Sequence, residues 1–570
     1  MKQALVRSVL GAFIFLCACA FVTFCYLQTG WLEPELQQRF FILTLMACTV
    51  GILLFASGRP TFALVMGGFL FFALKFIAVM KLRYLESPLM LADFTYFART
   101  SLVETLEHYP HFRRLALALC VFVPLLVGLI WYLSRNIFTR LRLLPAAGIR
   151  LAGAAICALL FGSCLLPSGP FASLYHDGLW DKLKGNAQLT DFFINIHDSR
   201  PHLPPLASAV LAEQNWALTA TGMPATHTPY PDIVQVLEES TFDPAHFTGC
   251  TIAQCRVRMF QPDADTRAHG MLRTHTFGGG TWVSEFTALT GMPQDIFGQA
   301  GMYAPYVLAP RIHDSLPMLL HRLGYLTVAI YPAGGNFINA RNAYREYGFD
   351  QFYDINDLGL TMWHTTDAQM FAAAKRVYDK IKKPGQPVFF MILTLEQHGP
   401  HDDKPLASLP APFNQGLLPA LPAKQELNLS TYLSRLQSSD EGMTQLENDF
   451  LKRSEPTVIV HFGDHLPSFS DAIVKMPQTL PAELQRYKNN LTYYMIKSNF
   501  DAPELPAYPM LDIAYLPSRV LRTAGLPEDS YFSALTTMET RCHGLYVDCP
   551  DKPMLESYYT WIFDRLHVYQ

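Results

Sequence analysis

The segment PTVIVHFGDH, residues 456–465, is a short apolar run that ends on a carboxylate and an imidazole. Two further segments, DIVQVLEES at 232–240 and PVFFMILTLEQH at 387–398, follow the same order. Continuous apolar runs of about 4–8 residues are typical of strands that are buried on both faces. The three segments therefore predict three buried strands, each with ionisable side chains at its carboxyl end.

Helical patterns alternate with these strands. Residues 315–325, 368–383 and 432–453 predict helices, and the segment LTVAIYP at 326–332 predicts one more strand. Such alternation is typical of an α/β domain with a mainly parallel central sheet covered by helices. In these sheets the carboxyl ends of the strands share one edge, and ligands bind there. We therefore expect the ionisable side chains of the three segments to meet at one site.

The first third of the chain is much more apolar than the rest. Only 16% of all residues are charged, against about 25% in an average soluble domain. A helix that spans a bilayer needs about 20 apolar residues. Five stretches are close to that length: residues 8–28, 40–57, 60–80, 115–134 and 148–166. The first is followed by further spans and lacks a clear cleavage site, so we expect a retained helix and not a signal peptide.

The positions of Lys and Arg predict the orientation of these spans. Lys2 and Arg7 precede the first span, and Arg135, Arg140 and Arg142 crowd the short loop between the fourth and the fifth. Cytoplasmic loops are enriched in Lys and Arg, so both segments are predicted to be cytoplasmic. An odd number of spans then places the remaining chain outside. The chain is therefore expected to cross a membrane several times, with the residues after about 170 on the outer side.

Three regions follow from these patterns. Residues 1–170 are predicted to form a transmembrane domain of five helices. Residues 171–228 contain Pro-rich segments such as RPHLPPL and predict a juxtamembrane helix and a linker. Residues 229–570 are predicted to form the catalytic domain. Lys75, inside the third span, is expected to snorkel towards the membrane edge or, alternatively, to contact a lipid headgroup.

The cysteines differ between these regions. Seven of the 11 lie in the predicted spans, where a thiol acts as a small apolar side chain. The other four suggest two local disulfides in an oxidising compartment, Cys250–Cys255 and Cys542–Cys549. The alternative is four free thiols in a reducing compartment. A zinc site is disfavoured because no His or third Cys completes either pair.

The composition also excludes some classes of protein. The formal net charge is −4, with no basic excess, so nucleic-acid binding has no electrostatic support. The apolar fraction of 50% excludes an intrinsically disordered chain. The composition fits a membrane protein with a folded soluble part.

The loop HTFGGGTWVSEF, residues 275–286, contains a candidate nucleophile. Gly278, Gly279 and Gly280 permit a sharp turn and a close backbone approach to a ligand just before Thr281. A helix that begins near Thr281 would direct its free N–H groups towards an anion. A bound divalent cation can activate a hydroxyl by lowering its pKa. The alternative is that Thr281 only caps the helix.

Four motifs now carry a resemblance to a known family. LEES at 237–240, GGGTWVSEF at 278–286, EQHGPH at 396–401 and FGDHLP at 462–467 occur here in the same order as in lipoteichoic acid synthases and membrane phosphoglycerol transferases. The chain resembles this family over nearly its whole length, including the five preceding spans. The family belongs to the alkaline phosphatase/sulfatase superfamily, so the resemblance implies that fold for the soluble domain.

The resemblance implies a metal-dependent phosphoglycerol transferase. It implies one divalent cation, most often Mn²⁺ and alternatively Mg²⁺ or Zn²⁺, held by Glu239, Thr281, Asp464 and His465. An oxygen-rich ligand set with one imidazole suits Mn²⁺ or Mg²⁺ on chemical grounds as well. Thr281 would take the phosphoglycerol group from phosphatidylglycerol and pass it to a glycan acceptor of the cell envelope. His398 resembles the family's histidine near the transferred phosphate, as a proton donor or as a phosphate ligand.

The same resemblance suggests where the headgroup binds. Asn339 and Arg341, in the segment GGNFINARNAY at 334–344, resemble the family's headgroup-binding stretch. The family order of aromatic residue, Asn and Arg reads Ile338, Asn339, Ala340 and Arg341 in this chain. Asn339, Arg341 and His398 are therefore the expected substrate-binding residues.

Three alternatives remain at this point. A phosphoethanolamine transferase shares fold and mechanism but usually has a Gly-Glu-Thr-x-Arg metal strand, and LEESTF at 237–242 differs from it. A sulfatase needs Cys or Ser in a C/S-x-P-x-R motif, and the stretch that begins at Cys255 lacks the Pro and the final Arg. A catalytically inactive protein that binds envelope glycans is the third alternative.

Overall fold

The computed structural model divides the chain into two compact units, Met1–Arg200 and Pro201–Gln570. It describes residues 2–85, 88–96, 110–140, 143–175, 187–196, 206–216, 229–246, 250–418, 421–470 and 480–566. Arg142 and residues 176–186, 197–205 and 217–228 of the predicted juxtamembrane region lie outside the described residues. Each unit is described below by itself.

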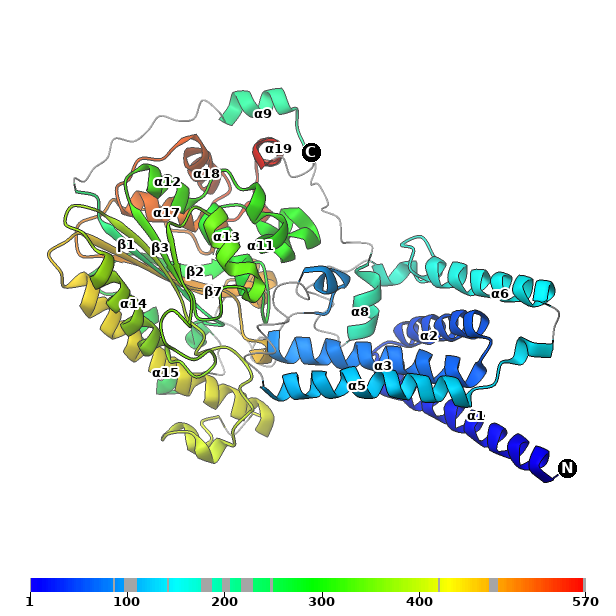
Figure 1. Cartoon of the computed structure of the whole chain (residues 1–570). Coiled ribbons are helices and arrows are strands. Elements are labelled where there is room, and N and C mark those ends of the chain that lie inside the picture. The colour runs from blue at the N-terminus through cyan, green and yellow to red at the C-terminus, as the bar shows by residue number, and fades with distance from the viewer. Residues whose placement is uncertain are drawn as a thin grey trace. The chain divides into compact units, whose positions relative to one another are not determined.

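The first unit is built from long apolar helices (Figure 1). They are α1 (Lys2–Gln28), α2 (Leu36–Ser57), α3 (Pro60–Leu85), α5 (Pro110–Leu133) and α6 (Leu143–Cys164), followed by the short α8 (Gln188–Ile194). Within the described residues, five stretches are long and apolar enough to cross a membrane: Val9–Leu32, Leu36–Ser57, Pro60–Arg83, Arg113–Thr139 and Ala146–Cys164. These match the five predicted spans, so this part of the fold prediction is confirmed.

Lys75 forms an ion pair inside this unit. Its Nζ lies 3.3 Å from Oε1 of Glu33, whose side chain is fully buried. The backbone N–H groups of Leu189 and Thr190 donate to the same carboxylate, at 3.4 and 3.3 Å. A buried charge requires such partners. The expectation that Lys75 snorkels or contacts a headgroup is therefore replaced by a pairing with Glu33, which also holds the first turn of α8.

The second unit is built on one eight-stranded sheet with the order β4-β3-β5-β1-β6-β7-β2-β8. The strands are β1 (Asp232–Glu238), β2 (Thr266–Arg273), β3 (Leu326–Ile330), β4 (Gln351–Tyr353), β5 (Val388–Leu393), β6 (Thr457–Gly463), β7 (Leu491–Ser498) and β8 (Leu511–Asp512). Strand β7 is antiparallel to both of its neighbours, β6 and β2, and all other pairings are parallel. The predicted mainly parallel sheet is confirmed.

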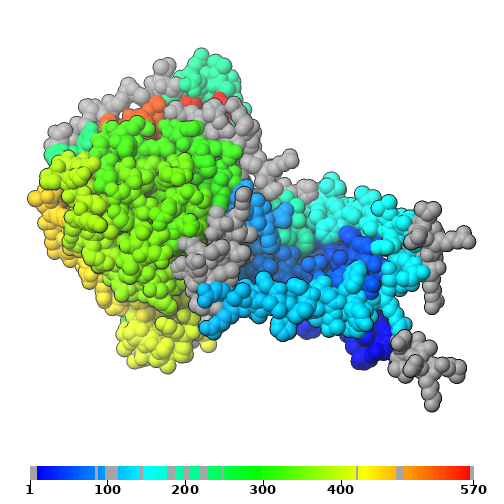
Figure 2. All heavy atoms as spheres, in the orientation of Figure 1, coloured from blue at the N-terminus to red at the C-terminus, as the bar shows by residue number. Residues whose placement is uncertain are grey.

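Helices cover both faces of this sheet (Figure 1). They are α9 (Ala209–Trp216), α10 (Thr281–Thr290), α11 (Ala304–Val307), α12 (Leu316–Arg322), α13 (Ala340–Glu346), α14 (Asp367–Ile381), α15 (Ala423–Leu451), α17 (Leu516–Thr523), α18 (Ser530–Arg541) and α19 (Lys552–Leu566). Helices α14 and α15 lie on one face, and α12, α13 and α17 lie on the other. In the space-filling view, side chains from the middle of the chain cover the visible face of this unit (Figure 2).

The central strand shows why its sequence is apolar throughout. Ile233 and Leu237 of β1 belong to the core under α12 and α17. Val234 and Val236 belong to the core under α14 and α15. Successive side chains of a strand point to opposite faces, so a strand covered on both sides needs apolar residues at both. This two-sided burial produces the apolar runs from which β1, β5 and β6 were predicted.

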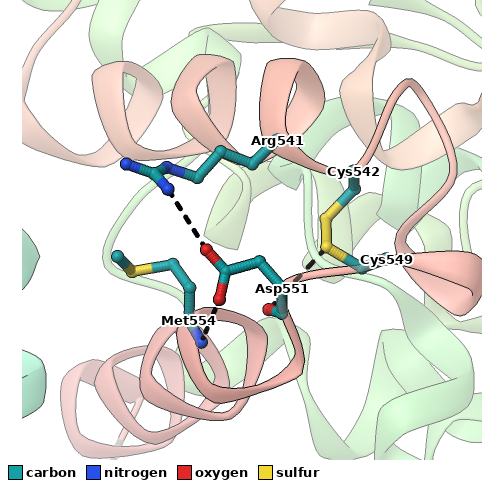
Figure 3. The surroundings of a disulfide bond; sticks show 5 residues. All are labelled: Arg541, Cys542, Cys549, Asp551 and Met554. Atoms are coloured by element: carbon teal, nitrogen blue, oxygen red, sulfur yellow. Dashed lines mark hydrogen bonds and ion pairs between the residues drawn. A yellow bond between two sulfur atoms is a disulfide. The ribbon is translucent and has the colours of Figure 1, made fainter.

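Both expected disulfides are present in the second unit, Cys250–Cys255 and Cys542–Cys549. The second joins the end of α18 to the segment that enters α19 (Figure 3). Beside it, Asp551 accepts a hydrogen bond from Arg541 at 3.1 Å and one from the backbone N–H of Met554 at 3.3 Å. The disulfide and the ion pair thus tie the two helices together at one point.

Candidate active site

The site begins where three adjacent strands end. Strand β1 lies between β5 and β6, and Leu237 of β1 pairs with Leu393 of β5 and Phe462 of β6. Because the three strands are parallel, the residues that follow them emerge at the same edge of the sheet. Glu239 follows β1, the pair Asp464–His465 follows β6, and the loop with His398 follows β5. The expected convergence of these segments is therefore present.

The four predicted metal ligands form one cluster. The hydroxyl of Thr281 donates to Oε2 of Glu239 at 2.6 Å and lies 3.4 Å from Nε2 of His465. That nitrogen is 3.4 Å from Oε1 of Glu239 and 3.2 Å from Oδ2 of Asp464. The ligand atoms of Glu239, Asp464 and His465 all lie within 4.8 Å of one another. All three side chains are buried.

Hydrogen bonds from behind orient these ligands. Oδ1 of Asp464 accepts the backbone N–H groups of Ser240 at 2.7 Å and His465 at 2.8 Å. Oδ2 of Asp464 has no hydrogen-bond partner among the described residues. Nδ1 of His465 lies 3.0 Å from the carbonyl of Leu466, so it donates there and leaves the Nε2 lone pair facing the cluster. Outer hydrogen bonds of this kind are typical of metal-binding histidines. The donor set therefore fits a divalent cation.

The electrostatics of the cluster favour a cation. Burial raises the pKa of Asp464 well above its usual range, and the charge of Glu239 raises it further. Burial raises the pKa of Glu285 to about 8. Burial also acts to raise the pKa of Glu239, but the imidazoles of His465 and His398 help to hold it below its usual value. Buried carboxylates that repel one another are stabilised by a positive charge placed between them.

The turn before Thr281 has the predicted backbone. Gly278 and Gly280 adopt positive φ angles of 71° and 88°, a region that favours glycine. Gly280 is the N-cap of α10, and Thr281 is its first residue. The alternative that Thr281 serves as the cap is therefore wrong, because its hydroxyl is bonded to Glu239 instead. Ser284, one turn later, donates to the carbonyl of Asp464 at 2.7 Å and ties α10 to the cluster.

A further glycine, Gly463, permits the close approach of the two segments that carry the predicted metal ligands Glu239 and Asp464. A Cβ at Gly463 would lie 1.8 Å from the carbonyl oxygen of Thr241, which is far inside van der Waals contact. Only glycine therefore lets the end of β6 pass the turn at residues 239–241. In that turn Ser240 has a φ of 51°, and its hydroxyl donates to Oε1 of Glu239 at 3.0 Å.

His398 lies in a loop that is held from behind. Its Nδ1 is 2.7 Å from the carbonyl of Gly399. Arg435 of α15 donates to the backbone carbonyls of Glu396, His398 and Pro400, at 3.4, 2.8 and 3.2 Å. Arginine carries several donors in a fixed planar arrangement, so one side chain fixes three carbonyls of this loop. Arg435 was not predicted as a site residue.

The predicted headgroup residues make contacts of their own. The side chain of Asn339 donates to the carbonyl of Pro305 at 2.9 Å. Arg341 donates to Asp354 at 2.6 Å and to Asp357 at 3.3 Å. The structure thus brings Glu239, Thr281, Asp464 and His465 together, whereas Asn339 and Arg341 have their recorded hydrogen bonds outside this cluster.

Ser240 and Arg435 contact residues of the candidate site, but neither was predicted as a site residue. Ser240 stands inside the LEES motif, so its position next to Glu239 was visible, but its hydrogen bond to that residue was not. Arg435 lies within a helix that was predicted at 432–453 and is observed at Ala423–Leu451. A lone Arg in such a helix is most often a solvated charge, and no local pattern connects it to a loop 37 residues earlier.

Comparison with known proteins supports this architecture. Residues 231–502 match the sulfatase family model. A protein of Haemophilus influenzae, described as uncharacterized, is 27% identical over 557 residues, which cover 93% of this chain and 95% of that protein. The lipoteichoic acid synthase of Staphylococcus saprophyticus is 27% identical over 201 residues, which cover 33% of this chain and 28% of the synthase.

Solved structures extend the likeness. The phosphoglycerol transferase GacH of Streptococcus pyogenes has a TM-score of 0.50 at 18% identity, covering 64% of this chain and 95% of GacH. The integral membrane lipooligosaccharide phosphoethanolamine transferase A of Neisseria meningitidis has a TM-score of 0.52 at 12% identity, covering 90% of this chain and 96% of that protein. Residues 231–502, which match the sulfatase family model, thus lie in a domain of the sulfatase fold, in a chain whose described residues include five candidate membrane helices.

Proposed function

We propose that this protein is a membrane-anchored transferase that moves phosphoglycerol from phosphatidylglycerol to a glycan acceptor of the cell envelope. The hydrogen bond of 2.6 Å from the Thr281 hydroxyl to Glu239, inside a cluster of metal-ligating atoms, carries the proposal. A threonine that begins a buried helix has no structural need for such a contact. In this position the hydroxyl of Thr281 would be the nucleophile that attacks the phosphorus atom of the donor.

The proposed reaction has two steps. Oγ1 of Thr281 attacks the phosphorus atom, and the bond between phosphorus and the diacylglycerol oxygen breaks. A hydroxyl of the acceptor then attacks the same phosphorus atom, and the bond to Oγ1 of Thr281 breaks. Glu239 accepts the hydrogen bond of the Thr281 hydroxyl and so orients it before the first step. The proton of the attacking hydroxyl is released to solvent in each step. His398 either protonates the leaving oxygen or binds a phosphate oxygen.

A divalent cation is part of the proposal. Glu239, Thr281, Asp464 and His465 would hold it, and Mn²⁺ or Mg²⁺ suits this oxygen-rich set best. When bound, the cation would lower the pKa of the Thr281 hydroxyl and neutralise charge at the phosphorus centre. The backbone N–H groups at the start of α10 add positive potential at the same place.

The choice of phosphoglycerol over phosphoethanolamine rests on sequence. The metal strand reads LEESTF and not Gly-Glu-Thr-x-Arg. The named curated relative described above is a lipoteichoic acid synthase. The structural likeness to both GacH and phosphoethanolamine transferase A shows the fold alone and does not choose between the headgroups.

The proposed setting is the inner membrane of a bacterium, with the catalytic unit on the periplasmic side. The two disulfides of the second unit support an oxidising compartment. A membrane anchor suits the reaction, because both the donor lipid and the released diacylglycerol remain in the bilayer. Topology is tested with reporters fused after Gln570 that are active on one side only, and activity in the cytoplasm would contradict this orientation.

The experiment follows the covalent intermediate. The full-length protein in nanodiscs is incubated with Mn²⁺ and phosphatidylglycerol or phosphatidylethanolamine, and the mass added to the peptide that contains Thr281 is measured. A glycerol phosphate adduct supports the proposal, and a phosphoethanolamine adduct would replace it by the alternative.

Two variants serve as controls for the nucleophile. Thr281→Val keeps the shape of the side chain but removes the hydroxyl, so adduct and diacylglycerol release should be lost. Thr281→Ser keeps a hydroxyl and should retain part of the activity. A Val variant that releases diacylglycerol at the wild-type rate would eliminate the covalent mechanism.

A further inference from the structure

A tryptophan next to His398 has an uncommon backbone. The backbone N–H of His364 donates to the carbonyl of Thr361 at 3.2 Å, so residues 361–364 form a turn with Trp363 at its third position. Trp363 has a φ of 70°. Turns with a positive φ at this position favour Gly or Asn, and a bulky residue there is costly and needs support from its surroundings.

The surroundings hold this turn on both sides. Before it, the N–H of Leu360 donates to the carbonyl of Ile355 at 3.0 Å. After it, Thr366 caps α14 in a reciprocal arrangement with Gln369. Directly after the turn, the hydroxyl of Thr365 donates back to the carbonyl of Thr361 at 2.8 Å. The backbone therefore keeps Trp363 in place, and a glycine at this position would form the same turn without the indole.

The indole packs against the imidazole of His398. Its ring centroid lies 4.6 Å from that of the His398 imidazole, with the two planes at 57°. Nδ1 of His398 is bonded to the carbonyl of Gly399 at 2.7 Å, so the remaining ring nitrogen, Nε2, is the one available to a substrate. The ring contact and this hydrogen bond together fix the orientation of the imidazole.

The indole N–H of Trp363 has no acceptor in the described part of the chain, although the nitrogen is buried. A buried donor without a partner destabilises the folded protein. An oxygen of a bound phosphate removes this cost, because phosphate oxygens are strong acceptors. A strained turn, a ring contact with His398 and an unpaired donor thus coincide in one side chain.

We propose that Trp363 positions the donor headgroup: its ring holds the imidazole of His398, and its N–H donates to an oxygen of the headgroup phosphate. This inference rests on the proposed function for the identity of the donor. It assigns to a residue of the 361–364 turn part of the headgroup binding that the resemblance gave to Asn339 and Arg341.

The test compares two Trp→Phe variants of the full-length protein. Trp363→Phe keeps an aromatic ring beside His398 but removes the unpaired N–H, so KM for phosphatidylglycerol should rise about tenfold with kcat nearly unchanged. The matched control is Trp216→Phe, because the N–H of Trp216 donates to Ser557 at 3.2 Å. This control should lower Tm and leave KM unchanged.

A second pair separates strain from contact. Trp363→Gly relieves the positive φ but removes the ring, so kcat/KM should fall further than in Trp363→Phe. His543→Gly relieves a φ of 50° at an exposed residue and should leave kcat/KM unchanged. A Trp363→Gly variant with wild-type kcat/KM, or a Trp363→Phe variant with wild-type KM, would overturn the inference.

A binding measurement distinguishes this inference from the proposed function. The dissociation constant of sn-glycerol-1-phosphate is measured by calorimetry for the wild type and Trp363→Phe, with Mn²⁺ present. A tenfold weaker binding in the variant supports the role of Trp363 even if the wild type fails to release diacylglycerol, a result that would refute only the proposed function. Equal constants, or no binding by the wild type, would overturn the inference.

Discussion

Replacing Asp464 by Asn tests the metal cluster most directly, because the expected effects on the metal-free and metal-loaded proteins have different signs. Oδ1 of Asp464 accepts two backbone N–H groups at 2.7 and 2.8 Å, and the Asn oxygen can keep both. Oδ2 has no hydrogen-bond partner among the described residues. The Asn amide that takes its place carries donors next to Glu239 and His465 instead of a negative charge.

The magnitude follows from burial and from linkage. Because burial and the charge of Glu239 raise the pKa of Asp464, its ionised form destabilises the metal-free fold as the pH rises above the unfolded value of about 4. Asp464→Asn should therefore leave the metal-free Tm at neutral pH unchanged or higher. In the wild type, Mn²⁺ at 100 times its dissociation constant adds about 2.7 kcal/mol, or roughly 3 °C for a unit of this size.

The assay is differential scanning calorimetry of the wild type and two variants, with EDTA and with Mn²⁺. Asp464→Asn should lose the Mn²⁺-dependent rise in Tm together with transferase activity. Asp379→Asn is the control, because Asp379 is half-exposed and pairs with Lys375 on the surface of α14. A wild-type Mn²⁺ response in Asp464→Asn, or a metal-free Tm several degrees below that of the wild type, would refute the reasoning.

Three further predictions concern the support of the site and the fold. Arg435→Gln loses at least two of its donors to the His398 loop, so kcat/KM should fall about tenfold or more, and a wild-type value in steady-state kinetics would contradict this role. Burial and the charge of Glu396 raise the pKa of Asp367 to about 7, so its stabilising effect is complete below about pH 4 and is lost as the pH rises through about 7. Asp367→Asn should flatten this part of the pH dependence in urea unfolding, and an unchanged slope would exclude the effect. Alkylation without reductant should leave Cys542 and Cys549 unmodified, and a labelled thiol in the unreduced protein would rule out this disulfide. Reduction of the disulfide should lower the free energy of unfolding by roughly 2–3 kcal/mol for so short a loop, as measured by urea unfolding.

The sequence alone determined those features that depend on neighbours along the chain. Burial on both faces required the apolar runs of β1, β5 and β6, and strand–helix alternation implied that their carboxyl ends share an edge. The three glycines before Thr281 indicated a turn that only glycine adopts easily, and the structure has it. The long apolar stretches of the first unit followed from the thickness of a bilayer.

The antiparallel strand β7 (Leu491–Ser498) and its partner β2 (Thr266–Arg273) were not predicted. Strand β2 is only partly buried along most of its length, so it lacks the apolar run that identified β1. Strand β7 is fully buried, but its direction in the sheet depends on which neighbours it pairs with. The apolar pattern of a single strand reports burial and period, and it does not by itself decide whether that strand pairs in parallel or antiparallel.

Tertiary structure alone decided the contacts between distant segments. Arg435 reaches the loop of His398, Trp363 contacts the imidazole of His398, and Lys75 pairs with Glu33 over 42 residues. Arg435 and Trp363 are ordinary in their local sequence, and Lys75 stands out as a charge in an apolar span, but none of the three local sequences indicates the partner. The role of each side chain arises because the packing of apolar faces brings its helix or loop next to a distant part of the chain. Burial at this contact then makes an unpaired charge or donor costly. Local sequence fixes which residues must be buried, and only the complete fold fixes which partners they meet.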